Sequence, residues 1–412
     1  MDNVEQLYRA ILENPAEDIL RLIYADALEE AGASERAAFI RTQVMLQRYP
    51  EYDPVALRIR YTHASAQPDP AWLGDWELPE GVNWATEPYR RGLPGAIEVR
   101  DGATFLRHAA DVLARYPIES LEFRVVRVGE ARALADCPLL QQITTLTFPQ
   151  GTSGQVIGPL LASEYFTRLK ELRLGSQFTT AATVAAVVNS AVFPQLTSLA
   201  IRNDSRAGGP LAGELARLTA PPQLRRLDLS GNRLSADVLA RLVVSPAVQT
   251  VEELHLSDNN LGASGITALA TGTLPALRSL HLARTRPQEA GVNTLTHAPF
   301  FRNLRHLSLS GNNLGSTAAI ALAKASADHL HVLNLSDNRI GNRGLAALAQ
   351  SPQRDNLLVL NLANCRINDE GLTAILKEPR LSQFLHLDLS GSLLSESYQE
   401  LLQAHPGVRV QL

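Results

Sequence analysis

The sequence is poor in cysteine and in aromatic residues, and it lacks any long apolar run. Its 412 residues include two cysteines, Cys137 and Cys365, which lie far apart in the chain and form neither a disulfide framework nor a multi-cysteine zinc site. No stretch approaches the roughly 18 apolar residues of a transmembrane helix. The opening MDNVEQLYRA lacks the basic start and apolar core of a signal peptide. We therefore expect a cytoplasmic protein without a membrane segment.

The charge balance excludes a strongly basic protein. The formal net charge is −4, which argues against a dedicated nucleic-acid binder, and 45% hydrophobic residues argue for a folded chain. Nine acidic and five basic residues fall within the first 50 positions, so the rest of the chain is neutral. This difference in composition predicts a separate N-terminal module.

The sequence also lacks the common catalytic motifs. It contains no GxxxxGK phosphate loop, no GxGxxG after a strand, no HExxH and no GxSxG. We therefore expect a protein that is not an enzyme and that holds no cofactor.

An LxxLxLxxN frame repeats along most of the chain. Its second leucine recurs every 25 to 28 residues. The positions are Leu121, Leu146, Leu172, Leu199, Leu227, Leu254, Leu280, Leu307, Leu333, Leu360 and Leu387. The pattern resembles the leucine-rich repeat family, and its long period resembles the ribonuclease-inhibitor-like subclass. The resemblance covers about residues 92–412.

Each repeat unit reads as a strand followed by a helix. The LxLxx stretch alternates with period two, and segments such as GASGITALATGTL place apolar residues at helical spacing. Strands stack about 4.8 Å apart and helices about 10 Å apart, so stacked units must curve. The predicted fold is α/β: a curved solenoid with a parallel inner sheet and outer helices, about eleven clear repeats and degenerate terminal ones.

The ninth frame position is asparagine in several repeats. These residues are Asn232, Asn259, Asn312 and Asn338. In the leucine-rich repeat family this asparagine bonds the backbone of adjacent repeats, so the resemblance implies a structural asparagine ladder. Cys365 stands at the same position and is expected to have a structural role.

Residues 1–49 predict a small helical module with helices at 2–14, 17–31 and 34–48. The second helix is expected to face inward through Ile19, Leu22, Ile23 and Ala27. The stretch from Ile11 to Gln43 resembles the bacterial repeat-companion domain, which has no assigned activity. The residues that match it are Pro15, Asp18, Arg21, Leu22, Tyr24, Ala25, Asp26, Leu28, Glu29, Glu30, Gly32, Arg36, Ala37, Phe39, Ile40, Arg41 and Gln43. The resemblance implies a bacterial source.

Two interpretations of this module's acidic residues stay open. Asp26, Glu29 and Glu30 lie close together on one helix, and Arg36 and Arg41 are available to pair with them. The plain interpretation is structural pairing. The sharper one is a binding surface for a partner shared among such bacterial proteins.

Residues 50–91 predict a linker rich in proline and tryptophan that caps the solenoid. Repeat arrays must cover their terminal leucines, and Trp72, Trp76 and Trp84 are suited to that role. Residues 92–100, GLPGAIEVR, read as a first degenerate repeat and resemble the junction after repeat-companion domains. The predicted domains are therefore 1–49, 50–91 and 92–412.

Large polar side chains are expected on the concave face, at frame positions three and five. The candidate partner-binding residues are Arg226, Asp228, Glu253, His255, His281, His306, Asn334 and Asn361. His255 and His281 should lie about 5 Å apart on adjacent strands. Three histidines beside Glu253 are chemically able to hold zinc, but ring stacking explains them as well, and we expect no metal there.

A second candidate surface runs along the turn edge at frame position ten. It consists of four arginines, Arg233, Arg286, Arg339 and Arg366. Such a row is able to hold an acidic protein or a phosphate. Asp258 and Asp337 nearby are expected to offset its charge.

The favoured function is a non-catalytic scaffold that binds a folded protein on the concave face, acting as a monomer. The partner is not identified by the sequence, and nucleic acid and membrane are not expected partners. The alternative is a regulator that inhibits or activates an enzyme such as a nuclease or small GTPase, by analogy with proteins of the same repeat subclass. An activator would need an exposed arginine such as Arg284 or Arg286.

Overall fold

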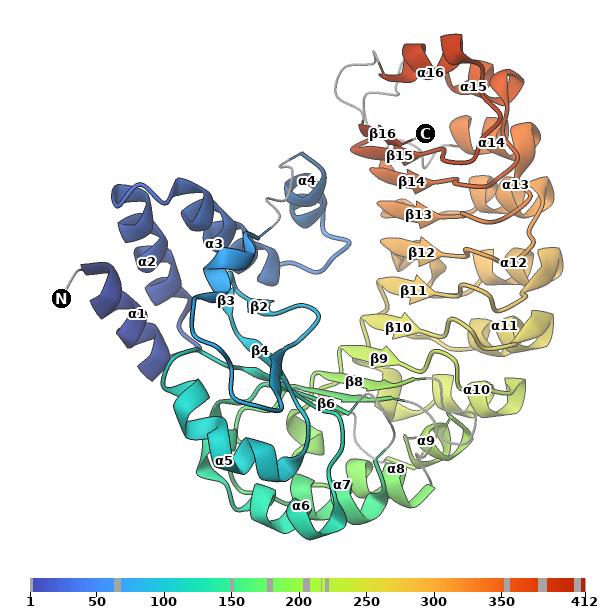
Figure 1. Cartoon of the computed structure of the whole chain (residues 1–412). Helices are drawn as coiled ribbons and strands as arrows, with labels where there is room; N and C mark the ends of the chain where they lie inside the picture. Colours follow the sequence, from blue (N-terminus) through green and yellow to red (C-terminus); the bar gives the residue numbers. More distant parts are fainter. Residues whose placement is uncertain are drawn as a thin grey trace. The chain divides into compact units, whose positions relative to one another are not determined.

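The computed structural model of the chain separates into two compact units. It describes residues 3–62, 68–148, 152–175, 181–202, 208–215, 217–218, 222–351, 356–376, 384–403 and 409–411. The N-terminal unit comprises Met1–Glu51 and His63–Asp204, and the C-terminal unit comprises Tyr52–Thr62 and Ser205–Leu412. The elements of both units are labelled in Figure 1.

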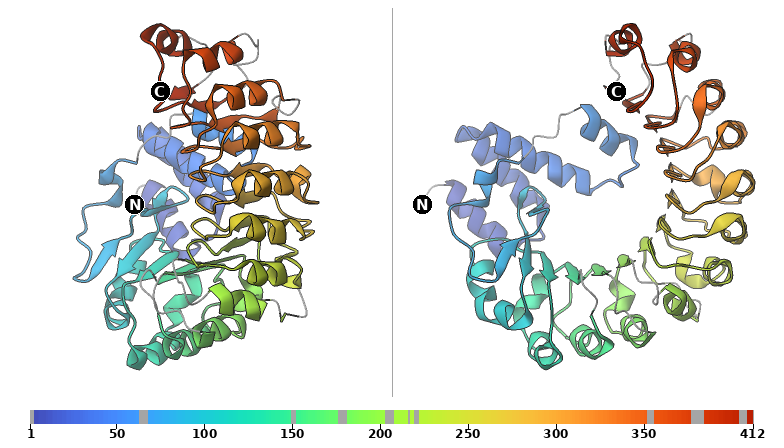
Figure 2. Two further views of the ribbon diagram at one scale, coloured as in Figure 1. Left: turned by 90° about the vertical axis from the view of Figure 1, so that its right-hand side faces the viewer. Right: turned by 45° about the vertical axis from the view of Figure 1, so that its right-hand side comes forward.

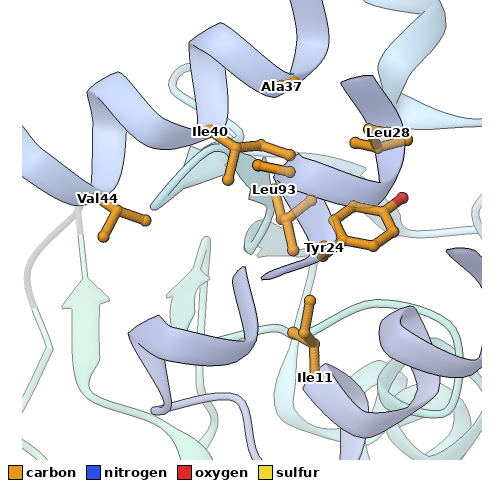
Figure 3. Packing of buried hydrophobic residues seen from close by; sticks show 8 residues of the cluster. Ile11, Tyr24, Leu28, Ala37, Ile40, Val44 and Leu93 are labelled. Carbon is orange, nitrogen blue, oxygen red and sulfur yellow. The ribbon is translucent and has the colours of Figure 1, made fainter. Parts of the chain in front are cut away.

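The N-terminal unit starts with the three predicted helices. They are α1 (Asn3–Glu13), α2 (Asp18–Glu30) and α3 (Ser34–Gln47), each within one residue of the expected bounds. Their shared core contains Ile11, Tyr24, Leu28 and Ile40, and it also takes in Leu93 from outside the three helices. Figure 3 shows these side chains converging. The helical module therefore shares its core with the first repeat region.

The predicted inward face of α2 is partly wrong. Ala27 is buried, but Ile19 is 64% exposed and Ile23 is 44% exposed. Arg21 is fully buried instead. The buried face of the helix is rotated from the expected one: it carries Tyr24, Ala25 and Leu28 together with Arg21.

Arg21 is buried beside a carboxylate from the first repeat. Its Nη2 lies 3.6 Å from Glu119 Oε2, and its Nη1 donates to the Pro15 carbonyl. Arg91 also pairs with Glu119 and lies 2.9 Å from Asp18 Oδ1. Burial, followed by the charge of Arg91, lowers the pKa of Arg21 to about 10. One carboxylate thus compensates two buried guanidinium groups and ties the module to the repeats.

Gly92 allows the chain to pass directly over α3. It has a φ of +82°, and a β-carbon added there would lie 2.4 Å from the α-carbon of Ile40. No other residue type fits this combination of conformation and contact. The preceding β2 (Tyr89–Arg90) pairs with β3 (Leu93–Pro94) to form a short hairpin around this glycine.

The N-terminal unit continues as strand–helix repeats. One antiparallel strand, β1, pairs with β4, and the following strands are parallel. The strands are β1 (Val82–Trp84), β4 (Ala96–Val99), β5 (Ser120–Phe123), β6 (Thr145–Phe148), β7 (Glu171–Leu174) and β8 (Ser198–Ile201). The helices between them are α5 (Gly102–Leu113), α6 (Val128–Ala135), α7 (Gly154–Leu161) and α8 (Ala181–Val188). Short 3₁₀ turns lie at η1 (Pro70–Leu73), η2 (Pro138–Gln142) and η3 (Phe193–Gln195).

The tryptophan-rich stretch packs at the start of this sheet. Trp72 contacts Phe39, with ring centroids 5.4 Å apart, and Trp84 meets Tyr116 edge to face at 4.9 Å. Trp84 belongs to β1, which covers the edge of β4. These contacts place the stretch where a cap is needed.

The C-terminal unit repeats the same alternation, with a parallel sheet. Its strands are β9 (Arg226–Asp228), β10 (Glu253–His255), β11 (Ser279–His281), β12 (His306–Ser308), β13 (Val332–Asn334), β14 (Val359–Asn361), β15 (His386–Asp388) and β16 (Arg409–Gln411). Its helices are α9 (Gly208–Leu215), α10 (Ala236–Val243), α11 (Gly262–Ala270), α12 (Gln288–Thr296), α13 (Ser316–Lys324), α14 (Gly341–Ala349), α15 (Asp369–Leu376) and α16 (Glu396–Gln403), with 3₁₀ turns η4 (Pro246–Val248) and η5 (Phe301–Asn303). Figure 2 shows these strands on the inner side and these helices on the outer side of the unit.

The buried asparagines join consecutive repeats of the C-terminal unit. Asn259 accepts hydrogen bonds from the Asn232 and Leu234 amides and donates to the Leu229 and Leu256 carbonyls, at 2.9 to 3.0 Å. Asn312 and Asn338 make the same kind of contacts two and three repeats further along. Each amide side chain therefore satisfies backbone groups of two repeats that would otherwise be buried without partners.

Cys365 takes the asparagine position in the repeat of β14. Its Sγ is fully buried and donates to the Leu335 carbonyl at 3.0 Å. Burial raises the pKa of the thiol to about 11, so it stays protonated and unreactive at neutral pH.

One helix of the C-terminal unit comes from early in the chain. The helix α4 (Pro54–Thr62) packs Leu57 against Val332 and Val359. Asp53 begins this helix by accepting from the Val55 amide at 2.8 Å, and Pro54 follows at its first position. This segment lies within the range expected to cap the start of the solenoid, but it packs on strands near the other end of the chain.

A pair of glycine substitutions tests the passage over α3. Gly92→Ala should destabilise the N-terminal unit by about 3 kcal/mol or more, because it adds a backbone overlap to a left-handed φ. Gly32→Ala should cost only about 1 kcal/mol, because Gly32 has a φ of +88° but no atom within 4 Å of the added β-carbon. All three tryptophans belong to this unit, so urea denaturation followed by tryptophan fluorescence reports it. Equal costs for the two variants would contradict the close contact.

Neutralising the shared carboxylate tests the ion-pair cluster. Glu119→Gln should cost about 3–5 kcal/mol, since it removes the carboxylate beside the fully buried Arg21, whereas Arg91 keeps Asp18. Asp26→Asn is the control, because Asp26 is exposed and its partner Arg41 keeps Glu29; its cost should not exceed about 1 kcal/mol. The same fluorescence measurement compares them, and a mild effect at Glu119 would refute its role.

Candidate functional site

The structure brings the candidate histidines together on the concave side of the C-terminal unit. His255 of β10 is the register partner of His281 of β11. Their rings stack with centroids 3.9 Å apart and an interplanar angle of 5°. His306 of β12 meets His281 edge to face at 4.5 Å. His255 and His281 are therefore neighbours on adjacent strands, as expected. The three rings, two stacked and the third edge to face, are named the histidine ladder below.

Charged residues border the histidine ladder. Arg226 Nη1 lies 3.3 Å from Glu253 Oε2, and the same oxygen lies 3.8 Å from His255 Nε2. Ser279 Oγ is 3.0 Å from His281 Nε2. The Arg226 side chain is 34% exposed, whereas those of Glu253 and His255 are 16% and 14% exposed. Arg226 therefore offers the largest accessible charge in this group.

Burial keeps His281 and His306 neutral at neutral pH. Desolvation, with the neighbouring His255, lowers the pKa of His306 to about 4. Desolvation lowers the pKa of His281 as well, and the nearby His306 and His255 add to the effect. For Glu253, burial raises the pKa, but the nearby His255 and the charge of Arg226 outweigh burial and lower it. The result is that two neutral rings, His281 and His306, lie near the ionised carboxylate of Glu253.

The described residues contain no group of three or more histidine, cysteine, aspartate or glutamate side chains arranged to hold a metal ion. In the ladder, His255 and His281 are parallel and in face-to-face contact. Stacked rings direct their nitrogens sideways within their own planes, and not toward one shared point between them. The geometry favours an aromatic surface over a chelating site.

The other candidates at the fifth frame position are engaged locally. Asp228 accepts from the Ser230 amide, Asn334 from the Ser336 amide, and Asn361 from the Ala363 amide, each at 3.0 Å. These are contacts to the backbone two residues on, which stabilise the turn after each strand. Partner binding by these three residues stays a prediction.

The edge arginines are all exposed. Arg233, Arg286, Arg339 and Arg366 make no ion pair with another residue in the described ranges. The two aspartates that were expected to offset the charge of these arginines form contacts with other residues. Asp258 forms a two-pronged pair with Arg284 instead, with 2.7 Å between Arg284 Nη2 and Asp258 Oδ2, and Asp337 accepts from Asn364.

Sequence reasoning missed that the segment Tyr52–Thr62 lies on the concave side. Besides the Leu57 contact, Tyr61 stacks on His386 of β15, with centroids 4.8 Å apart and an angle of 14°. Tyr52 is only 2% exposed. The available signal was the sequence Asp53-Pro54, a good helix start, followed by apolar residues at helical spacing.

The N-terminal unit carries a second polar cluster that was not predicted. Arg173 donates to Glu171 at 2.8 Å, and Ser198 donates to the same carboxylate at 3.1 Å. Arg90, from β2, lies 3.4 Å from Ser120 Oγ. Burial and the charge of Arg173 lower the pKa of Arg90. Here too, a segment outside the repeats reaches the third and fifth frame positions.

Five segments of the chain match models of the leucine-rich repeat. One model, described as Leucine Rich repeat, matches residues 249–270, 302–323, 328–349 and 356–376, and another, described as Leucine Rich Repeat, matches residues 223–242. The chain therefore carries leucine-rich repeats. Together with the strand–helix alternation and the helical N-terminal region, these matches confirm the predicted fold.

Similarity to curated proteins is partial. The chain is 27% identical over 220 residues to tubulin-specific chaperone E of Danio rerio, which is 49% of this chain and 40% of that protein. It is 31% identical over 160 residues to the ribonuclease inhibitor of Sus scrofa, at 37% and 34% coverage. It is 35% identical over 136 residues to Protein NLRC5 of Mus musculus, at 32% and 7% coverage. The chain thus spans less than half the length of each of these relatives.

Similarity to solved structures supports the fold. A chain of the Rad7 and Elc1 complex from yeast matches with a TM-score of 0.50 and 17% identity, over 75% of this chain and 86% of that one.

In the described part of the chain, every helix falls short of the length or apolar character needed to cross a membrane.

Because His281 and His306 are neutral in the folded chain, we expect the folded chain to lose stability in acid. The folded-state pKa values of His281 and His306 lie below the unfolded value of about 6.5, so their contribution is complete above that pH. It is lost as the pH falls from about 6.5 toward the folded value near 4. The protection factors of the β10–β12 amides, which correct for the slower intrinsic exchange in acid, should fall over this range.

The matched control replaces the titrating rings. A His281→Gln plus His306→Gln variant should show a flatter pH dependence of exchange than the wild-type chain, although His331 also has a pKa lowered by burial and keeps its own contribution. Parallel pH profiles for the two proteins would show that the ladder does not titrate on unfolding.

Proposed function

We propose that the chain is a non-catalytic scaffold that binds a folded protein partner through the concave face of its C-terminal repeats. The observation that carries this proposal is the run of large polar and aromatic side chains on consecutive strands, from Arg226 through the histidine ladder. Arginine and aromatic rings are typical of the residues that dominate protein interfaces. A broad surface of this kind suits a macromolecule better than a small substrate.

The similar proteins are consistent with this proposal. The names of two of them, tubulin-specific chaperone E and ribonuclease inhibitor, describe proteins that act on other proteins. Neither name transfers a partner to this chain, because the match covers less than half of each. The proposal therefore specifies the surface and the class of partner.

A second candidate function is the regulation of an enzyme, as inhibitor or activator. The partial similarity to ribonuclease inhibitor favours it. An activator that supplies an arginine would use Arg286, which is exposed, because Arg284 is already paired with Asp258. Loss of stimulation on Arg286→Ala, with Arg284→Ala as the comparison, would distinguish this function from passive binding.

The finer assignments from sequence belong to the same proposal. We infer a cytoplasmic monomer from a bacterium, with residues 1–49 as a repeat-companion-like module. The exposed Ile19 and Ile23 on α2, next to the acidic Asp26, give that module a surface of its own. A nine-acid module of this kind suits a basic partner better than an acidic one.

Affinity capture tests the concave-face assignment. His255→Ala plus His281→Ala should weaken capture of a specific protein from the source cell's lysate by at least about tenfold, which is the typical loss when one or two interface hot spots are removed. The control is Arg233→Ala plus Arg339→Ala, which alters the arginine edge and leaves the ladder intact. A partner lost only from the edge variant, or retained by both, would reject the concave face as the binding surface.

A further inference from the structure

We propose that the concave face over β13, β14 and β15 is a docking site for a short amphipathic helix of a partner protein, and that α4 is the resident ligand which such a helix displaces. The inference rests on the proposed function in placing partner binding on the concave side. It adds a second subsite next to the histidine ladder, a chemical class for its ligand, and a segment that competes for it.

The receptor surface is an apolar patch at positions that are polar elsewhere. The third frame position carries Arg226, Glu253, Ser279 and His306 in the repeats of β9 to β12, but valine in the next two. The second frame position changes in the same way, from charged residues and His331 to leucine. The apolar patch consists of Val332, Leu358, Val359 and Leu385. Four neighbouring apolar residues on an otherwise polar inner sheet form a surface whose exposure to water would be unfavourable.

The helix α4 covers this patch with one face. Leu57 is 4% exposed and packs between Val332 and Val359, which are themselves 9% and 4% exposed. Tyr61, four residues further along, packs on the same cluster and stacks on His386. Residues four apart lie on one side of a helix. A leucine and an aromatic residue at this spacing are therefore the recognition pair of the ligand.

The start of the segment fixes its direction along the repeats. Tyr52 is buried within electrostatic range of four charges that precede or begin β10 to β12, namely Glu252, Glu253, Arg305 and Arg278. Burial beside these carboxylates raises the pKa of its phenol to about 12. The segment thus runs from the border of the histidine ladder toward β15. Figure 2 shows α4 on the strand side of the C-terminal unit.

The helix α4 is short and depends on packing for its stability. It has nine residues, and a helix of this length is marginal in water without packing. Its other face is open, with Val55 42% exposed. The segment Tyr52–Thr62 belongs to the C-terminal unit, whereas the residues on both sides of it in the sequence belong to the N-terminal unit. A longer helix with the same leucine–aromatic pair would bury more area on the same patch.

Peptide binding tests the site directly. The probe is a fluorescent peptide with the sequence of residues 51–62, EYDPVALRIRYT, measured by anisotropy. A full-length Leu57→Ala plus Tyr61→Ala variant loosens the resident helix. This opened variant should bind the peptide at least about tenfold more tightly than the wild-type chain, whose own α4 competes at a high effective concentration.

Two controls identify the contacts. A peptide carrying the same two alanines should not bind the opened variant. Adding Val332→Ser and Val359→Ser to the opened variant should abolish binding; serine occupies the equivalent position at Ser279 and is compatible with the fold. Equal affinity of wild-type and opened chains, or binding that survives the serine substitutions, would overturn the proposal.

Hydrogen exchange on the wild-type chain gives an independent readout if the opened variant does not fold. Saturating peptide should accelerate exchange of the amides of residues 57–61 and leave those of β13 to β15 protected. Unchanged protection of α4 would overturn displacement. If mixing wild-type and opened chains produces a dimer by sedimentation, the ligand is a second copy's α4, and the assignment to a different partner protein is wrong.

The peptide-binding and affinity-capture experiments test the helix site and the scaffold function separately. A chain that loses its partner on changing His255 and His281 but never binds the peptide supports the scaffold and rejects the helix site. A chain that binds the peptide through Val332 and Val359, with capture unaffected by the ladder, supports the helix site and rejects the ladder as the main binding surface.

Discussion

The hydrogen bonds of the buried asparagines are the constraint on which the rest of the C-terminal unit depends. After each strand the chain leaves the sheet and must turn toward its helix, and the turn exposes backbone groups that no neighbouring strand can pair. Asn259, Asn312 and Asn338 satisfy these groups across two repeats at a time. They therefore hold the strands in register, and every surface property of the inner sheet follows from that register.

The concave face is a direct product of this alignment. Because His255 and His281 are register partners, their rings lie side by side and stack. Burial lowers the pKa of His281. The same alignment groups Val332 with Val359 two strands further on. One inner sheet therefore carries a polar aromatic half and an apolar half, and α4 runs from the border of the first into the second.

The parts of the structure that were predictable depend on local pattern, and the parts that were not depend on contacts between distant segments. Repeat spacing gave the strands and the approximate helix bounds, since each unit contacts its immediate neighbours. Arg21 was not recognisable as a buried residue, because its partner Glu119 lies almost one hundred positions away and hydrophobic patterns assign arginine to the surface. The destination of α4 was hidden for the same reason. Its helical character was readable from Asp53-Pro54, but its receptor was visible only as an unexplained break in the polar pattern at Val332 and Val359.

The substitution of asparagine by Cys365 has a mechanical consequence for the end of the array. A thiol is a weaker hydrogen-bond donor and acceptor than an amide, so Cys365 joins the repeats of β13 and β14 less firmly than Asn259, Asn312 and Asn338 join theirs. The helix α4 contacts β13, β14 and β15, and its packing therefore stabilises the connection between these repeats. Removal of α4 would let the last repeats bend or unfold together. Coverage of the inner face by α4 and the rigidity of the terminal repeats are therefore coupled.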